Sequence, residues 1–120
     1  MKTDYEFLKT EIDGHILTVT INRPERMNAL HPPAHAEFDE VWNEFDKDEN
    51  LWVGIITGEG DRAFSAGNDL KFQAEAGGKM DINMASSGFA GLTSRFNLTK
   101  PLIAAVNGVS MGGGFEIALA

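Results

Sequence analysis

Two glycine-rich turns contain the residues whose types and spacing could support catalysis. The first spans residues 64–70 and reads Phe-Ser-Ala-Gly-Asn-Asp-Leu, and the second spans residues 107–116 and includes three consecutive glycines. Each turn comes after an apolar, β-branched run, at 52–57 and 102–106, which predicts a buried strand. The first N–H groups of a following helix have no intrahelical acceptor, so each turn can present free donors at a strand's carboxyl end. Two such donors directed at one point would form an oxyanion hole.

The second turn also carries a carboxylate. Glu116 comes three positions after Gly113, so the two residues share one side of the first helical turn if a helix begins at Gly113. Glu116 could act as a general acid or base if the apolar neighbours Phe115, Ile117 and Leu119 remove water from it. It could equally be a first-turn acid that complements the helix dipole. The spacing leaves both interpretations open.

The first turn has the same two interpretations. The sequence Gly67-Asn68-Asp69 can place the Asn68 N–H at a helix entrance, with Asp69 as a capping or first-turn acid. Alone, this pattern is that of a plain helix N-cap. Two such turns after two neighbouring strands favour the oxyanion hole, because together they supply the pair of donors that an enolate oxygen requires.

Other motifs in the chain are incomplete. The glycines at 108–114 lack the G-x-G-x-x-G order, and residues 77–80 lack the upstream glycine and the Ser/Thr of a P-loop. Neither Ser65 nor Ser110 lies in a G-x-S-x-G sequence, so neither is predicted to be a nucleophile. The histidines have no acidic or thiol partner at metal-ligand spacing. We therefore expect no metal site and no nucleotide-binding loop.

The composition predicts a soluble globular domain. The chain has 120 residues, a net charge of −8 and no cysteine. An acidic balance argues against a nucleic-acid or membrane-surface binder, which would need a basic face. The absence of cysteine fits a reducing compartment, and the N-terminus shows no apolar targeting segment. We expect a cytoplasmic protein with no membrane span.

The elements that must position the two turns follow a β-β-α-β order. We predict strands at 6–12 and 16–22 joined by an Asp-Gly hairpin turn, a helix at 34–47, a strand at 52–57, a short helix at 69–76, a surface loop at 79–88, a helix at 89–98, a strand at 102–106 and a helix from residue 113. A helical connection predicts parallel pairing of the third strand with one of the first two. The last helix reaches Ala120 without a cap, so we expect the chain to end inside an element.

These motifs together resemble the enoyl-CoA hydratase/isomerase (crotonase) superfamily, over the N-terminal half of its domain. The resemblance rests on Asn-Arg-Pro at 22–24 with Met-Asn-Ala-Leu at 27–30, on residues 64–70, and on the run from Lys100 into Gly-Gly-Gly-Phe-Glu at 112–116. Within the superfamily, the sequences at 88–93 and 113–116 look most like the carnitinyl-CoA dehydratase branch.

The resemblance implies an α/β fold of repeated ββα units, the ClpP/crotonase spiral, of which residues 1–120 would be the N-terminal part of a single domain. It implies trimers or paired trimers that bind acyl-CoA thioesters, with no cofactor apart from the coenzyme A of the substrate. Asn68 and Gly113 match the two oxyanion-hole positions, and Glu116 matches the first catalytic glutamate. A second glutamate would lie beyond Ala120. The residues expected to bind the CoA thioester are Arg26, Ala29, Ala66, Asn68, Asp69, Leu70, Met111, Gly112 and Gly113.

The expected reaction is the addition or removal of water across the 2,3-double bond of an enoyl-CoA, through an enolate held by the oxyanion hole. An enoyl-CoA isomerase or another thioester enzyme of the superfamily is the alternative, because one oxyanion hole serves several reactions. A non-catalytic acyl-CoA binder or assembly subunit is the alternative outside enzymes. We expect the 120 residues alone to be inactive, and nothing in the sequence specifies the acyl group.

Overall fold

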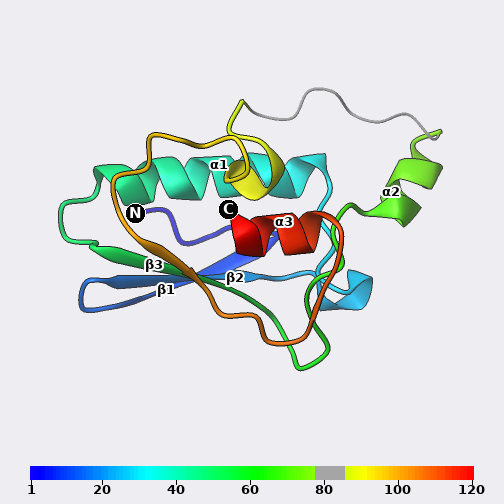
Figure 1. The fold of residues 1–120 in the computed structure, drawn as a ribbon, viewed down its shortest axis with the longest axis horizontal. Helices are drawn as coiled ribbons and strands as arrows, with labels where there is room; N and C mark the ends of the chain where they lie inside the picture. The colour runs from blue at the N-terminus through cyan, green and yellow to red at the C-terminus, as the bar shows by residue number, and fades with distance from the viewer. Residues whose placement is uncertain (78–85) are drawn as a thin grey trace.

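The computed structural model describes residues 1–77 and 86–120, and Figure 1 shows the path of the chain. The elements, in chain order, are β1 (Leu8–Asp13), β2 (Ile16–Ile21), the 3₁₀ turn η1 (Pro24–Arg26), α1 (Pro32–Lys47), β3 (Val53–Gly58), β4 (Ala63–Ser65), α2 (Leu70–Glu75), the 3₁₀ turn η2 (Phe89–Gly91), β5 (Leu102–Ala104), β6 (Val109–Ser110) and α3 (Gly113–Leu119). No helix in these two stretches is long and apolar enough to span a membrane.

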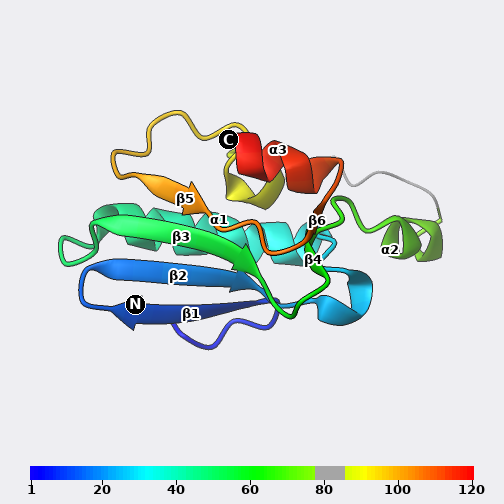
Figure 2. The ribbon, with the colours of Figure 1, turned by 60° about the horizontal axis from the view of Figure 1, so that its bottom comes forward.

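The main sheet has four strands in the order β1-β2-β3-β5 (Figure 2). β1 and β2 form the predicted antiparallel hairpin, and β3 pairs parallel to β2, as the helical connection α1 predicted. β5 extends the sheet by pairing parallel to β3. The Asp-Gly turn works because Gly14 has a φ of 59°, which glycine adopts without strain.

The core lies between this sheet and α1. Alternate residues of β2 point inward, and Leu17, Val19 and Ile21 are fully buried. They face the apolar stripe of α1, which includes Phe38 and Trp42. The helix begins at Pro32, two residues earlier than predicted, with proline in the first turn where its missing N–H costs nothing.

The two glycine turns each contain residues of a second, smaller sheet. β4 and β6 pair parallel to each other, outside the main sheet. The prediction that the free donors follow the strands at 52–57 and 102–106 was therefore wrong, since they follow β4 and β6, short strands of three and two residues that overlap the turns. Strands this short leave no periodic signal in a sequence. The turns nevertheless lie at the carboxyl ends of two parallel, neighbouring strands.

The predicted helix at 89–98 was wrong. Only Phe89–Gly91 forms a 3₁₀ turn, and Ala90 within it has a φ of 55°. Leu92 is buried as predicted, but Phe96, expected on the buried face, is 91% exposed. The apolar spacing indicated a helix, whereas tertiary contacts hold this segment in a different conformation. The predicted loop at 79–88 lies mostly outside the described residues.

Candidate active site

Hydrogen bonds on either side of Asn68 leave its amide free in the first glycine turn. The Gly67 N–H donates to Ser65 Oγ (3.1 Å), and the Gly67 carbonyl accepts from the Leu30 N–H (2.8 Å). The Asp69 N–H donates to the Leu30 carbonyl (2.9 Å). Between these residues, the Asn68 N–H donates to no acceptor within residues 1–77 and 86–120. The turn is thus fixed on both sides of the available Asn68 N–H.

The second turn is organised in the same way. The Met111 N–H donates to the Ser65 carbonyl (3.1 Å), and the Gly114 N–H donates to the Met111 carbonyl (2.8 Å). Gly112, with a φ of 52°, redirects the chain into α3. The N–H of Gly113, the first residue of that helix, has no acceptor in the described part of the chain. It is one of the unsatisfied donors that every helix N-terminus carries.

The two turns are in direct contact. A Cβ atom added to Gly67 would lie 2.8 Å from the Gly113 nitrogen, and one added to Gly113 would lie 2.6 Å from the Phe89 ring. A Cβ on Gly114 would overlap the Ser65 carbonyl. Glycine is therefore needed at these positions for close approach, which brings the Gly113 N–H beside the turn that carries the Asn68 N–H.

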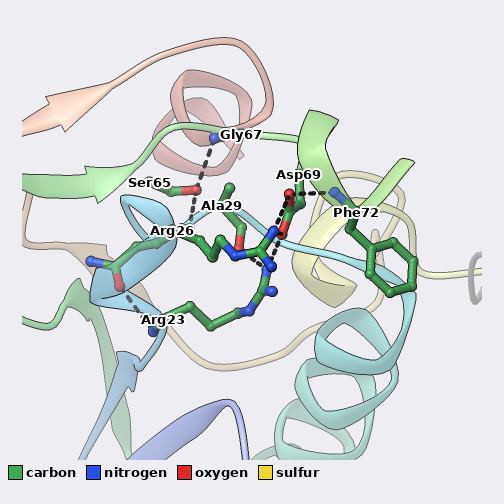
Figure 3. Close-up of polar contacts among 8 residues, drawn as sticks. Arg23, Arg26, Ala29, Ser65, Gly67, Asp69 and Phe72 are labelled. Carbon is green, nitrogen blue, oxygen red and sulfur yellow. Dashed lines mark hydrogen bonds and ion pairs between the residues drawn. The ribbon is translucent and has the colours of Figure 1, made fainter. Parts of the chain in front are cut away.

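Asp69 lies in a buried ionic cluster next to the first turn. Its carboxylate accepts the Phe72 N–H (2.9 Å), which confirms Asp69 as the N-cap of α2. Arg23 approaches the carboxylate at 2.9 Å and Arg26 at 3.4 Å (Figure 3). The side chains of Arg23 and Asp69 are almost completely buried, so each charge depends on the other for compensation.

The electrostatics of the cluster favour the charged form of Asp69. Burial by itself would raise the pKa of Asp69, but the Phe72 N–H and the Arg23 guanidinium outweigh burial and lower the pKa. Arg23 also donates to the Ala29 carbonyl (2.5 Å). The cluster therefore ties the start of α2 to the segment that contains Ala29, across the base of the first turn.

The other residues predicted to bind the CoA thioester lie around the two turns. Arg26 is half-buried and extends from η1 to Asp69. Ala29 is buried, and Ala66 is half-buried at the entrance to the first turn. Leu70 and Met111 are 72% and 63% exposed. Gly112 is exposed, with open space on its Cβ side. Their roles in binding remain predictions.

Glu116 lies in the first turn of α3, where its N–H donates to the Gly112 carbonyl (3.1 Å). The expectation that its apolar neighbours exclude water was wrong for two of the three. Ile117 is buried, but it packs into the core, whereas Phe115 and Leu119 are 54% and 71% exposed. Glu116 itself is exposed. A dry environment for this carboxylate is thus not supplied by its sequence neighbours.

Two supporting residues were not assigned a structural role from the sequence. Arg23 was noted only as part of a motif, yet it is the principal ion-pair partner of Asp69. Asn28 has a φ of 56°, and its buried side chain accepts the Arg23 N–H (3.0 Å) and donates to the Ala63 carbonyl (2.8 Å). The only local signal was the tolerance of asparagine for left-handed backbone.

Comparison with solved structures identifies the architecture. Enoyl-CoA hydratase from Mycobacterium tuberculosis H37Rv superimposes with a TM-score of 0.81 and 38% identity, over 94% of this chain and 42% of that one. A carnitinyl-CoA dehydratase from Mycobacterium avium 104 gives a TM-score of 0.84 and 36% identity, over 96% of this chain and 44% of that one. The predicted crotonase-type α/β fold is therefore confirmed.

Sequence comparison shows the family. The model of the enoyl-CoA hydratase/isomerase family matches residues 11–120, and the chain belongs to this family. It is 50% identical to carnitinyl-CoA dehydratase of Escherichia coli (strain K12) over 115 residues, which is 96% of this chain. The same alignment covers 43% of that relative, so the chain spans less than half the length of the curated relatives it matches.

Proposed function

We propose that the complete protein is an acyl-CoA hydratase or dehydratase. It adds water to, or removes it from, the 2,3-double bond of an enoyl-CoA thioester. The observation that carries this proposal is the contact between the two glycine turns. Each turn has a backbone N–H, that of Asn68 or that of Gly113, that donates no hydrogen bond to a described residue. Membership of the enoyl-CoA hydratase/isomerase family supports it.

In this mechanism the thioester carbonyl accepts hydrogen bonds from the Asn68 and Gly113 N–H groups. Water attacks C3, the double-bond electrons move into the carbonyl, and the resulting enolate oxygen is held by the two donors. A proton then adds to C2, and the water oxygen loses one of its protons. Glu116 orients the water or transfers a proton in these steps. Each oxyanion-hole donor contributes about 3 kcal/mol to such a transition state.

The two turns and their surroundings are also proposed to bind the rest of the thioester. Ala29, Ala66, Asp69, Leu70, Met111 and Gly112 would line the pantetheine and adenine path. Arg26, whose side chain is partly exposed beside Asp69, would contact the pyrophosphate. Coenzyme A enters as part of the substrate, with no further cofactor. We further propose a cytoplasmic homotrimer or hexamer.

The test is a Glu116→Gln variant of the complete protein, assayed for hydration of crotonyl-CoA and crotonobetainyl-CoA. Loss of a general acid or base typically costs about 10²–10⁴ in rate, so kcat should fall by at least about 100-fold. Glu49→Gln, at an exposed glutamate that follows α1, is the matched control and should retain the parent rate. A normal rate in the Glu116 variant would exclude the proposed role of this carboxylate.

Two further measurements separate the alternatives. An isomerase moves the double bond without net water, so the product would gain no oxygen from isotopically labelled water, whereas a hydratase product would. A non-catalytic binder would show no turnover but would be stabilised by CoA esters. A ligand at 100 times its dissociation constant adds about 2.7 kcal/mol to the free energy of unfolding, which a thermal-shift panel of CoA esters detects.

A further inference from the structure

Ser65 is a buried residue that the proposed chemistry does not yet use. It is the last residue of β4 and has no exposed surface. Its hydroxyl donates to the Asn28 carbonyl (2.8 Å) and accepts the Gly67 N–H (3.1 Å), as Figure 3 shows for Gly67. The hydroxyl therefore satisfies two buried backbone groups that would otherwise lack a partner, and one of them belongs to the first glycine turn.

The backbone of Ser65 contacts the second glycine turn. Its carbonyl accepts the Met111 N–H (3.1 Å), and Gly114 packs so closely against this carbonyl that any side chain would overlap it. Ser65, near the start of the first turn, is thus bonded through its side chain to Gly67 of the same turn and through its main chain to Met111 of the second turn. A movement of this one residue would shift one turn relative to the other.

We infer that Ser65 is a positioning residue that fixes the Asn68 and Gly113 N–H groups relative to each other. The inference rests on the proposed oxyanion hole. The Gly67–Asn68 peptide that carries the first donor has its oxygen held by the Leu30 N–H (2.8 Å), and the peptide before it is held by the Ser65 hydroxyl. Oxyanion holes act through donors that are already in place before the reaction. Loss of the hydrogen bond between the Ser65 hydroxyl and the Gly67 N–H would therefore weaken catalysis, although both donors would remain.

Ser110 provides a matched control in the neighbouring strand. It pairs with Ser65 in the register of β4 and β6, and its hydroxyl is also buried. Unlike the Ser65 hydroxyl, it has no hydrogen-bond partner among residues 1–77 and 86–120. Ser65→Ala and Ser110→Ala therefore each remove a buried hydroxyl from paired positions of the small sheet, but only the first leaves backbone groups unsatisfied.

The experiment compares the parent protein, Ser65→Ala and Ser110→Ala as complete proteins, using crotonyl-CoA as the probe. Ser65→Ala should lower kcat about tenfold with little change in KM, because the displaced donors act mainly on the transition state. It should also reduce the downshift of the thioester C=O stretching frequency in a bound CoA ester, which reports how strongly the two amides polarise the carbonyl. Ser110→Ala should match the parent in both.

The outcomes separate the inference from the function it rests on. A parent protein that neither hydrates crotonyl-CoA nor shifts the carbonyl frequency would overturn the proposed function. An active parent with Ser65→Ala equal to Ser110→Ala in kcat and in carbonyl frequency would overturn only the role of Ser65. If Ser65→Ala does not fold, Ser65→Cys takes its place, since a thiol is similar in size and a weaker hydrogen-bonding group. A kcat and a carbonyl frequency equal to those of the parent in Ser65→Cys would equally overturn the positioning role of Ser65.

Discussion

Gly67 combines a left-handed backbone with a contact that leaves no space for a side chain. Its φ is 95°, and an added Cβ would lie 2.8 Å from the Gly113 nitrogen. We predict that Gly67→Ala lowers the free energy of unfolding by the backbone cost of about 1–2 kcal/mol and by a further 1–3 kcal/mol or so from overpacking. Hydration activity should fall as well, because the second turn is pushed away from the first. Urea unfolding and kcat measurements check both effects.

Gly60 is the control for this prediction. It has a similar φ of 87°, but a Cβ there would meet nothing within 4 Å. Gly60→Ala should therefore lose only the backbone contribution and keep its activity. Equal destabilisation of the two variants, or full activity in Gly67→Ala, would show that the contact between the turns is looser than the structure has it.

Local sequence was enough to predict the cap but not its ion pair. Asp69 follows Gly67-Asn68 and precedes a helix, a pattern that identifies an N-cap without any tertiary information. Its partner Arg23 lies in a different segment, and only the path of the main chain brings the two buried charges to 2.9 Å. The same holds for Gly113, whose contact with the first turn depends on β4 pairing with β6.

Turn η2 is held against α1 by a histidine that must stay neutral. The Ala90 N–H donates to His35 Nδ1 (3.0 Å), so this nitrogen has to be the unprotonated one. The Trp42 Nε1–H donates to the Ala90 carbonyl (3.0 Å), and the Phe89 and His35 rings pack in an edge-type contact at a centroid distance of 4.4 Å. Protonation of His35 would turn the acceptor into a donor and break the link to the Ala90 N–H.

This arrangement predicts a dependence of stability on pH. Burial, with a smaller contribution from His31, lowers the pKa of His35 from 6.5 to about 4. Between these values the unfolded state binds more protons than the folded state, so the free energy of unfolding falls as the pH falls. The contribution of His35 is complete above about pH 6.5 and is lost below about pH 4, a difference of about 3 kcal/mol. Urea unfolding across this range measures the slope.

The test variant is His35→Asn. Asparagine can keep an acceptor near the position of Nδ1 without titrating, so His35→Asn should flatten the slope even if it lowers stability at every pH. Part of the slope should remain, because burial and the neighbouring Arg23 lower the pKa of His31 as well. An unchanged slope in His35→Asn would contradict the prediction.

At the scale of elements, prediction succeeded where a local pattern and the tertiary structure agree. The hairpin and α1 have strong turn, proline and periodicity signals, and the structure shows both. The segment at 89–98 also has helical spacing, but Ala90 is held in a left-handed conformation by partners on α1 more than 40 residues earlier. A propensity of a few tenths of a kcal/mol per residue is easily overridden by such buried bonds.

At the scale of the molecule, the described residues divide into a packed side and an open side. The packed side is the sheet and α1, where Leu17, Phe38 and Trp42 are fully buried. The open side includes α3, as Phe115, Glu116 and Leu119 are exposed. The chain thus forms a core that can hold both glycine turns in place, while the carboxylate beside them still faces water.

This division predicts the behaviour of the 120 residues on their own. Glu116 is exposed, so bulk water competes with the substrate for its carboxylate, and it should give little acid–base catalysis without further enclosure. We expect the isolated chain to hydrate crotonyl-CoA at least about 100-fold more slowly than a full-length relative. The carnitinyl-CoA dehydratase of Escherichia coli, of which this chain covers 43%, is the positive control.

Circular dichroism and hydrogen exchange on the same sample would show whether the isolated chain keeps its core. Protection should be high in β2 and α1, where the buried residues concentrate, and lowest in α3. A folded chain without turnover would show that the packed side forms independently. It would also show that the higher rate of the full-length relative depends on further structure around the glutamate that matches Glu116. Turnover close to that of the full-length relative would show instead that the two turns and an exposed glutamate are sufficient for the reaction.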